Sequence, residues 1–418
     1  MNVVCLVVDG LQSGMLGPYG NSWIDTPHLN RLAGEGFVFH QALVDSPHLS
    51  DVCRSLWTGA HARAQVKFVS LPARLAEAGV NTSLISDVVE VVEHPLAHDF
   101  REVAQTSPSA ADSIVDQWHE TQLARFFAQA VEQLRGLREP FVQWIHAGGL
   151  AGRWDAPAAI RERYLADEDL PPELVSRLYE LTTPSPACAT ANDDPDELLL
   201  TRLAYAAQVS VFDTCLAALN EALREAPFAD RTLLLLWGAR GFPLGGHGQL
   251  GFADFQLYSQ LTQVPCLMHC PATIEAGRSQ ALAQPADIAA TVLACYEMAP
   301  TSLGAGAGAS LLNLVEGPAR SHRDRALLCN HRGATALRTQ GWYLIRNSRQ
   351  VAPATDASAA AELYAKPDDR WEVNEVAVRL PHITAQLGEA LDELELAIEK
   401  DRSDPLTTLD PLLIEGAV

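Results

Sequence analysis

The chain opens with Val3-Val4-Cys5-Leu6-Val7-Val8, and this run leads directly into Asp9-Gly10. An unbroken apolar run of this length, rich in β-branched residues, is typical of a strand that is covered on both faces. Short apolar runs of the same kind recur at 82–85, 141–145 and 232–237. Amphipathic stretches with the three- and four-residue spacing of helices lie between them, at 71–78, 120–137 and 198–223. This alternation predicts an α/β fold in which helices flank a large, mostly parallel sheet.

The pattern changes after about Pro318. Short strand-like runs separated by polar turns follow at 326–329, 334–338, 342–346 and 362–364, and an amphipathic stretch covers 381–400. This succession predicts a smaller α+β unit with an antiparallel sheet and one helix. We therefore expect an α/β domain over residues 1–318 and a C-terminal subdomain over residues 319–418.

Composition excludes several classes of protein. The chain has 418 residues, is 48% hydrophobic and carries a net charge of −22. That apolar content is too high for a disordered acidic chain, and the charge has the wrong sign for a nucleic-acid binder. No apolar run reaches the roughly 18 residues of a membrane span, and a charged leader is not evident before Val3. We expect a cytoplasmic protein whose eight cysteines are buried thiols.

Several segments near the start of the chain share one pattern. After Asp9-Gly10 these are Leu16-Gly-Pro-Tyr-Gly20, Thr26-Pro-His-Leu-Asn-Arg-Leu-Ala33, Gly36-Phe-Val-Phe39 and Trp57-Thr-Gly59. In this order and without a gap, they resemble the opening of the sulfatase family, which belongs to the alkaline phosphatase superfamily. Weaker matches continue as far as Glu362-Leu-Tyr364. The resemblance implies an alkaline phosphatase-like fold for nearly the whole chain.

The resemblance also implies a reaction, which can be checked residue by residue. In the family, a formylglycine made from the first residue of the motif C/S-x-P-S-R attacks a sulfate ester beside a divalent cation. Without gaps, the nucleophile position falls on Leu49, which has no nucleophilic atom. A register shifted by one residue instead places Ser50 at the nucleophile and Arg54 at the arginine. Both registers stay open at this point.

The other site positions of the family are also substituted. Of the paired metal carboxylates after the first strand, Asp9 remains, but its neighbour is Gly10. The second pair of ligands falls on Ala239 and Arg240, and neither side chain can bind a hard cation. The family's Lys and His positions fall on 86–89, on Ala151, and near Phe252 or Ala253. We expect no metal cofactor; Ca²⁺ or Mg²⁺ would bind only if a remodelled site is active.

Asp9, Asp87 and Arg240 are expected to meet at one edge of the sheet, because the carboxyl ends of parallel strands lie together. We predict that the guanidinium of Arg240 replaces the metal and hydrogen-bonds one or both carboxylates. The complete set of residues expected around this former catalytic pocket is Asp9, Gly10, His48, Asp87, Ala239, Arg240 and His247.

These substitutions favour a sulfatase-like pseudoenzyme, which has lost sulfuric ester hydrolase activity and binds an unknown ligand or protein partner. The alternative is an active sulfate or phosphate ester hydrolase that uses Ser50, or a remodelled site around Asp9, Asp87, His48 and His247. A third option is a subunit that pairs with an active homologue. Neither nucleic acid nor a membrane is an expected partner, and a homo-oligomer stays open.

Overall fold

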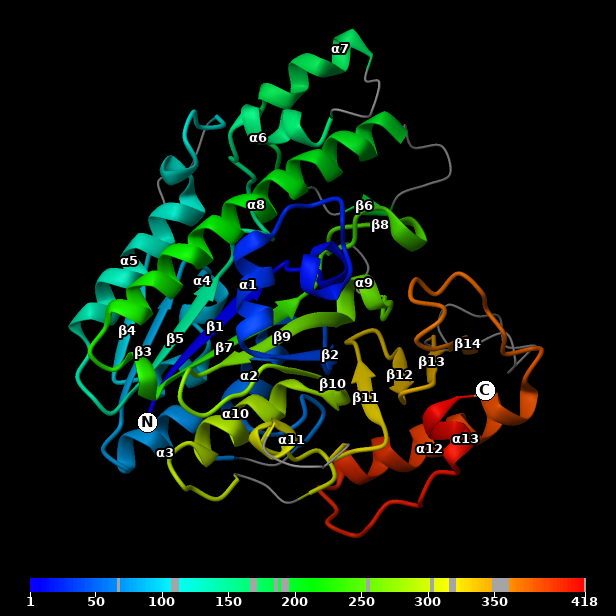
Figure 1. The fold of residues 1–418 in the computed structure, drawn as a ribbon. Coiled ribbons are helices and arrows are strands. Elements are labelled where there is room, and N and C mark those ends of the chain that lie inside the picture. Colours follow the sequence, from blue (N-terminus) through cyan, green and yellow to red (C-terminus); the bar gives the residue numbers. More distant parts are fainter. Residues whose placement is uncertain are drawn as a thin grey trace. The chain divides into compact units, whose positions relative to one another are not determined.

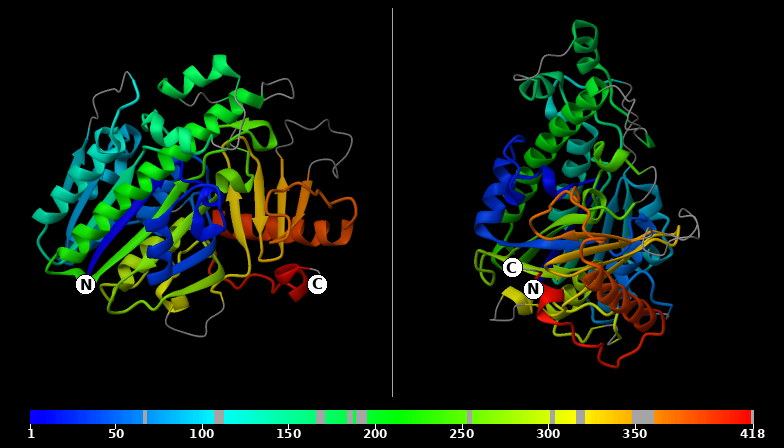
Figure 2. Two further views of the ribbon diagram at one scale, coloured as in Figure 1. Left: turned by 45° about the horizontal axis from the view of Figure 1, so that its top comes forward. Right: turned by 90° about the vertical axis from the view of Figure 1, so that its right-hand side faces the viewer.

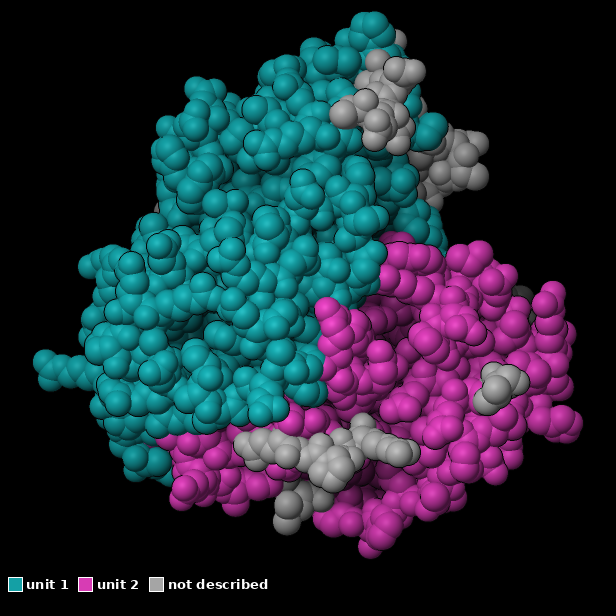
Figure 3. Space-filling view, in the orientation of Figure 1, with its two compact units in different colours: residues 1–38, 76–254, 264–277 teal, residues 39–75, 255–263, 278–418 magenta. Residues whose placement is uncertain are grey.

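The computed structural model describes residues 1–65, 68–106, 113–165, 171–183, 187–188, 195–252, 256–300, 304–315, 321–347 and 361–416. The chain divides into two compact units, which Figure 3 colours separately. Unit 1 comprises residues 1–38, 76–254 and 264–277, and unit 2 comprises residues 39–75, 255–263 and 278–418. The domain boundary predicted between residues 318 and 319 lies outside the described residues and stays a prediction.

The first strand, β1 (Asn2–Asp9), pairs in parallel with β5 (Phe141–Ala147) on one side and with β7 (Thr232–Arg240) on the other. Beyond β5, the strands β3 (Asn81–Ser86) and β4 (Glu102–Gln105) continue the parallel arrangement. The strand β9 (Gln263–His269) runs antiparallel to β7. With β2 (Phe37–Leu43) and β10 (Gly277–Ala283), the complete sheet has eight strands in the order β10-β2-β9-β7-β1-β5-β3-β4. The predicted α/β fold with a mostly parallel sheet is confirmed.

Alternation along β1 explains how unit 1 builds its core. Val4, Leu6 and Val8 belong to one apolar cluster together with side chains of α1 (Pro27–Glu35), α5 (Gln122–Gly136) and α8 (Pro195–Glu225). These helices can be followed in Figures 1 and 2. The side chains that lie between these three along β1 point to the opposite face of the sheet, because successive side chains of a strand alternate. All of β1 is buried, as its unbroken apolar sequence predicts.

One contact between helices fixes the start of α1. The carboxylate of Asp213, on α8, accepts hydrogen bonds from the backbone N–H groups of His28 (3.0 Å) and Leu29 (2.7 Å). The first turn of a helix leaves such N–H groups without an intrahelical partner, so an aspartate supplied by α8 serves as a cap. This contact ties α1 to α8 on their shared face of the sheet.

Unit 2 contains the predicted antiparallel sheet, with β11 (Ala326–Cys329), β12 (Thr335–Arg338), β13 (Trp342–Arg346) and β14 (Ala361–Ala365) in sequence order. The helix α12 (Pro381–Glu399) packs on one face of it, with apolar side chains of both in one cluster. A second cluster, which includes Leu328 and Tyr343, covers the other face. The expected C-terminal α+β unit is confirmed.

The remaining elements are shorter. In unit 1 they are η1 (Ser13–Met15), η2 (Gly17–Tyr19), α4 (Val89–Val92), η3 (Pro95–Asp99), η4 (Trp118–Glu120), α6 (Ala158–Arg163), α7 (Pro172–Val175), η5 (Ser176–Tyr179), β6 (Ala187–Cys188), η6 (Ala229–Arg231), η7 (Gly246–Gly248) and β8 (Gln249–Leu250). In unit 2 they are α2 (Leu49–Thr58), α3 (Leu71–Glu77), α9 (Ser259–Thr262), α10 (Pro285–Ala294), α11 (Leu312–Val315) and α13 (Pro411–Glu415).

The composition led to two expectations, one about membrane-spanning helices and one about the cysteines. In the part of the chain that the structure describes, no helix combines the length and the apolar character needed to cross a membrane. Seven cysteines are free thiols, and all but Cys295 are buried. The expectation of buried thiols is therefore confirmed for these positions, except that Cys295 is only half-buried.

Candidate functional site

The carboxyl ends of β1 and β7 bring Asp9 and Arg240 together in unit 1. The two residues are register partners, just past an irregularity in the ladder between Val8 and Asp9. Nε of Arg240 donates to Oδ1 of Asp9 (2.8 Å), and a terminal guanidinium nitrogen donates to Oδ2 (3.0 Å). Only 3% of the Asp9 side chain and 11% of the Arg240 side chain are exposed. This bidentate, almost completely buried ion pair confirms the prediction that Arg240 hydrogen-bonds Asp9.

An aromatic ring completes the surroundings of the guanidinium. Cζ of Arg240 lies 3.7 Å from the centroid of the Phe252 ring, in the geometry of a cation–π contact. One of the lysine positions of the sulfatase family falls at or near Phe252 or Ala253. Phe252 is described in the structure, whereas Ala253 lies outside the described residues. The ring and the Asp9 carboxylate hold the guanidinium in one orientation.

The backbone that follows Asp9 is held just as firmly. Gly10 has a φ of 79°, its N–H donates to the carbonyl of Arg240 (3.1 Å), and its own carbonyl accepts from the hydroxyl of Tyr205 (2.8 Å). A Cβ at this position would lie 2.6 Å from the backbone of Leu150. Glycine is therefore required here on two grounds, the left-handed backbone and the close approach of a second segment.

Asp87 lies just beyond the end of β3, at the same edge of the sheet. Its Oδ1 accepts a hydrogen bond from the backbone N–H of Gly148 (2.7 Å). Burial, with a smaller contribution from the negative charge of Asp9, raises the pKa of the Asp87 carboxyl to about 6, although the hydrogen bond from Gly148 opposes the shift. Asp9, Asp87 and Arg240 all lie at or just beyond the carboxyl ends of β1, β3 and β7, which run parallel in one sheet.

The sequence analysis did not assign a site role to His146, which occupies the same edge near the end of β5. It is register partner to Val7 of β1 and to Ser86 of β3. The imidazole is completely buried, and neither ring nitrogen has a hydrogen-bond partner among the described residues. Burial lowers the pKa of His146 to about 4, so the ring is neutral near pH 7. The one available signal was its position at the end of an apolar run.

The donor atoms at this edge do not fit a calcium or magnesium ion. Both carboxylate oxygens of Asp9 accept from a guanidinium, whose positive charge repels a cation. Gly10 and the buried Ala239 offer no side-chain oxygen. Hard cations need six or more oxygen ligands. Nowhere among the described residues do three or more His, Cys, Asp or Glu side chains gather in a way that could hold a metal ion.

The remaining pocket residue of unit 1 is His247. It lies in η7, is exposed and has a left-handed backbone with a φ of 51°. This conformation is unusual for a residue with a Cβ. It belongs to a turn between two glycines with positive φ, Gly245 and Gly248.

The segment that corresponds to the nucleophile motif lies in unit 2. Leu49 is the first residue of α2 and is 3% exposed, so the unshifted register places a buried leucine at the nucleophile position. Ser50 follows it and is exposed. The guanidinium of Arg54 donates hydrogen bonds to the carbonyls of Ala62 and Ala64. Arg54 thus fastens the chain that follows α2.

His48, the residue before α2, belongs to a small polar cluster. Its ring stacks on that of His331, with centroids 3.6 Å apart and ring planes inclined by 6°. The His331 backbone N–H donates to Nε2 of His48 (3.2 Å), and Nε2 of His331 lies 2.8 Å from a carboxylate oxygen of Asp51. Ser46 donates to the same Asp51 oxygen (2.7 Å). The expected neighbourhood of the nucleophile is therefore occupied by a stacked histidine pair and its hydrogen bonds.

An open α/β sheet with polar side chains at the carboxyl ends of its parallel strands defines a class of proteins that bind ligands at that edge. Within this class, the family model named Sulfatase matches residues 1–298. The chain therefore belongs to the sulfatase family, as its sequence motifs indicate. A search of curated proteins found no match.

Solved structures share the fold over nearly their full lengths. The phosphonate monoester hydrolase of Agrobacterium radiobacter superposes with a TM-score of 0.74 at 16% identity, covering 95% of this chain and 96% of that one. A protein in complex with its substrate D-glucosamine-2-N,6-O-disulfate gives 0.72 at 16% identity, covering 96% and 99%. A 2-O GAG sulfatase also gives 0.72 at 16% identity, covering 98% and 95%. At these identities the likeness establishes the fold alone.

Proposed function

We propose that this member of the sulfatase family has lost metal-dependent hydrolysis of sulfuric esters and serves to bind a ligand or a protein partner. The observation that carries this proposal is the ion pair of Asp9 and Arg240. A fixed guanidinium neutralises the one carboxylate left from the family's metal ligands, and it brings no water or hydroxide that could activate a nucleophile. According to this proposal, the protein needs no divalent cation for its function.

The nucleophile segment supports the same proposal. Leucine at position 49 is buried and chemically inert. In the shifted register, the arginine would have to stabilise the sulfate, but Arg54 already donates to two backbone carbonyls. Breaking these part-buried hydrogen bonds would leave two carbonyl groups unsatisfied, at a cost of up to about 1–3 kcal/mol each.

The decisive experiment combines metal analysis with an activity screen. Purified protein is analysed for bound metal by plasma mass spectrometry, and assayed with 4-nitrophenyl sulfate, 4-nitrophenyl phosphate and a phenyl phosphonate monoester, with and without Ca²⁺, Mg²⁺ or Mn²⁺. We expect less than one tenth of an equivalent of metal and no turnover above the buffer rate. One bound equivalent of a divalent cation, or cation-dependent turnover that Asp9→Ala abolishes, would overturn the proposal.

The second candidate function is an ester hydrolase with a remodelled site, and one observation favours it. At the carboxyl edge of unit 1, Asp87 has a pKa of about 6 and the His146 imidazole is neutral. Groups that titrate near the working pH are suited to general acid–base catalysis. This candidate predicts turnover of at least one of the three esters, lost on Asp87→Asn if the edge is used and on Ser50→Ala if the shifted nucleophile is used. Turnover that survives both substitutions would argue against it and point to a contaminating enzyme.

A further inference from the structure

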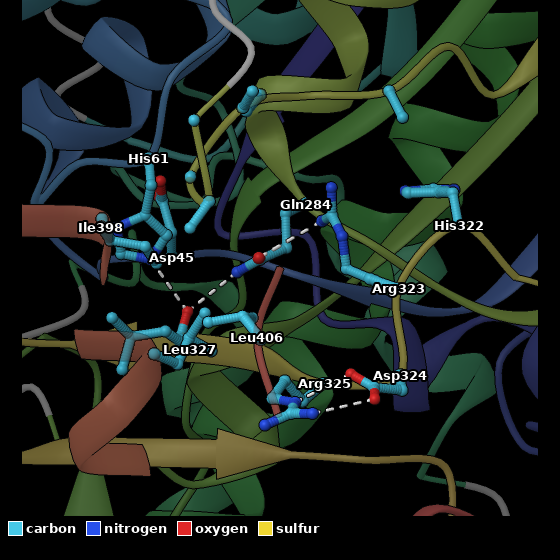
Figure 4. Close-up of a pocket in the computed structure, with 17 residues that line it drawn as sticks. Asp45, His61, Gln284, His322, Arg323, Asp324, Arg325, Leu327, Ile398 and Leu406 are labelled. Carbon is cyan, nitrogen blue, oxygen red and sulfur yellow. Dashed lines mark hydrogen bonds and ion pairs between the residues drawn. The ribbon is translucent and has the colours of Figure 1, made fainter. Parts of the chain in front are cut away.

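A second site of interest is a cavity of about 370 Å³ whose lining residues all belong to unit 2 (Figure 4). Leu394 and Ile398 of α12, with Leu406 from the segment that follows, make part of its wall apolar. Asp45 contributes a carboxylate to the polar part of the lining, and the segment His322–Arg325 contributes the rest of its charged groups. The volume is in the range of small-molecule sites in proteins.

Asp45 is the most unusual group in the lining. Its side chain is completely buried. Oδ2 accepts hydrogen bonds from the Ser55 hydroxyl (2.6 Å) and from the Ala62 backbone N–H (2.8 Å), but Oδ1 has no hydrogen-bond partner among the described residues. Burial raises the pKa of this carboxyl, although the electrostatic interaction with His61 and both hydrogen bonds oppose the shift. A buried acceptor atom without a partner is costly unless a ligand supplies the donor, and Asp45 is one of the residues that line the cavity.

The neighbouring His61 does not provide a positive charge for Asp45. Nδ1 of His61 accepts from the backbone N–H of Arg63 (3.1 Å), and Nε2 lies 3.0 Å from the carbonyl of Leu327, to which it donates. An imidazolium would carry a proton on Nδ1 and would lose the first of these hydrogen bonds. Burial also lowers the pKa of His61. The ring is therefore neutral and fixed in one tautomer.

The first guanidinium of the lining is already matched by a carboxylate. Arg323 donates to Oδ1 of Asp287 (2.5 Å), and Nε2 of His322 lies 3.3 Å from Oδ2 of the same carboxylate. Arg323 holds the pKa of Asp287 below its usual range. The charges of Arg323 and Asp287 therefore nearly cancel without a ligand.

The second guanidinium is paired with carboxylates too, although Nη1 of Arg325 is buried and has no hydrogen-bond partner among the described residues. Arg325 donates to both oxygens of Asp324 (2.8 and 3.0 Å), and it lies 3.6 Å from a carboxylate oxygen of Glu393. Two carboxylates therefore face one guanidinium. The two arginines of the lining are therefore each paired with a carboxylate other than that of Asp45.

We propose that this cavity binds a small aliphatic amine, whose ammonium group donates to Oδ1 of Asp45 and whose alkyl chain lies against Leu394, Ile398 and Leu406. An ammonium group would supply the missing hydrogen bond, and its positive charge would stabilise the ionised form of the Asp45 carboxyl. Nδ1 of His322 is a second buried atom of the lining without a hydrogen-bond partner among the described residues. It is an acceptor when Nε2–H donates to Asp287, so a second donor at the far end of the ligand, as in a diamine, would satisfy it.

The probes for this proposal are 1,4-diaminobutane, 1-aminobutane and butan-1-ol, titrated into the full-length protein by calorimetry at 0.3 M NaCl. High salt suppresses loose binding of cations to a chain of net charge −22. We expect one saturable site for the diamine, with binding of the monoamine weaker and that of the alcohol at least about tenfold weaker than that of the diamine, because the alcohol cannot pair with a carboxylate. Absence of a saturable site, or equal affinity for butan-1-ol, would overturn the proposal.

Substitutions in the lining and at a control position test whether the amine binds in this cavity. Asp45→Asn keeps an oxygen for Ser55 and Ala62 but removes the charge, and should weaken diamine binding at least about tenfold. Asp392→Asn removes an equal charge from an α12 side chain that is 66% exposed, and should leave binding unchanged. Unchanged binding by Asp45→Asn would refute the proposal. If that variant does not fold, Leu406→Trp decides: a larger side chain in the cavity should weaken binding, and unchanged affinity would place the amine elsewhere.

Discussion

Replacing Arg240 with methionine tests the central contact of the site. Methionine keeps an unbranched side chain under the Phe252 ring but leaves the carboxylate of Asp9 buried without its guanidinium. Removing one partner of a buried, bidentate ion pair typically costs about 3–5 kcal/mol, because the remaining charge stays desolvated. Since 97% of the Asp9 side chain is inaccessible, water can compensate only after the structure around β1 and β7 opens. We expect Arg240→Met to lower the free energy of unfolding by an amount in this range at pH 7.

The assay is equilibrium unfolding in urea, followed by tryptophan fluorescence of the full-length protein. The double variant Asp9→Asn/Arg240→Met carries no buried charge at this position, so it should recover most of the loss. A double variant no more stable than Arg240→Met would mean that the cost comes from packing and not from the unpaired charge.

A matched control separates burial from charge removal. Arg135 on α5 lies 3.7 Å from Glu132 in an exposed pair, with 63% and 80% of the two side chains accessible. Exposed pairs contribute about 0–1 kcal/mol, so Arg135→Met should change stability by less than about 1 kcal/mol. If Arg240→Met costs no more than this control, the Asp9–Arg240 pair does not stabilise unit 1 and the reasoning fails.

Two further predictions concern the same edge of the sheet. The folded pKa of Asp87 is about 6, above the value of 3.8 for a free carboxyl, so its contribution to stability is full below about pH 4 and is lost as the pH rises through 6. Relative to Asp87→Asn, the wild type should lose about 3 kcal/mol of unfolding free energy between pH 4 and 7, and parallel pH profiles in urea unfolding would contradict this. Tyr205→Phe removes the hydroxyl that donates to Gly10 and accepts from Gln12, so it should cost about 2 kcal/mol in the same assay; an unchanged midpoint would show that water replaces the hydroxyl.

Much of the fold could be predicted because buried parallel strands leave a strong signal in the sequence. The predicted strand at 232–237 is extended in the structure to Thr232–Arg240, and the predicted helix at 381–400 is observed as Pro381–Glu399. The strand β10 was not predicted, because it begins Gly-Arg-Ser-Gln and presents no apolar run. It lies at the end of the strand order, where one edge has no strand to cover it and polar residues are tolerated.

The candidate site was only partly predictable. Arg240 could be placed beside Asp9 because both positions follow from counting along strands whose carboxyl ends must meet. His146 also follows a predicted strand, at 141–145, but a lone histidine at the end of an apolar strand is compatible with any core, so no site role could be assigned to it. The cavity in unit 2 is assembled from segments as distant in sequence as Asp45 and Leu406. No spacing between such residues could have indicated that they share one lining.

The geometry of Gly10 has a consequence for the history of this protein. Restoring an oxygen-rich site would require carboxylate or amide side chains at positions 10, 239 and 240 together. Exchanging Arg240 alone would leave one carboxylate, and any side chain at position 10 would meet the Leu150 backbone in a left-handed conformation. Each of these substitutions alone would destabilise the chain before it added a ligand. Under the proposed function, the arginine at this edge therefore makes a metal site difficult to regain, and we expect descendants of this sequence to diversify in what they bind.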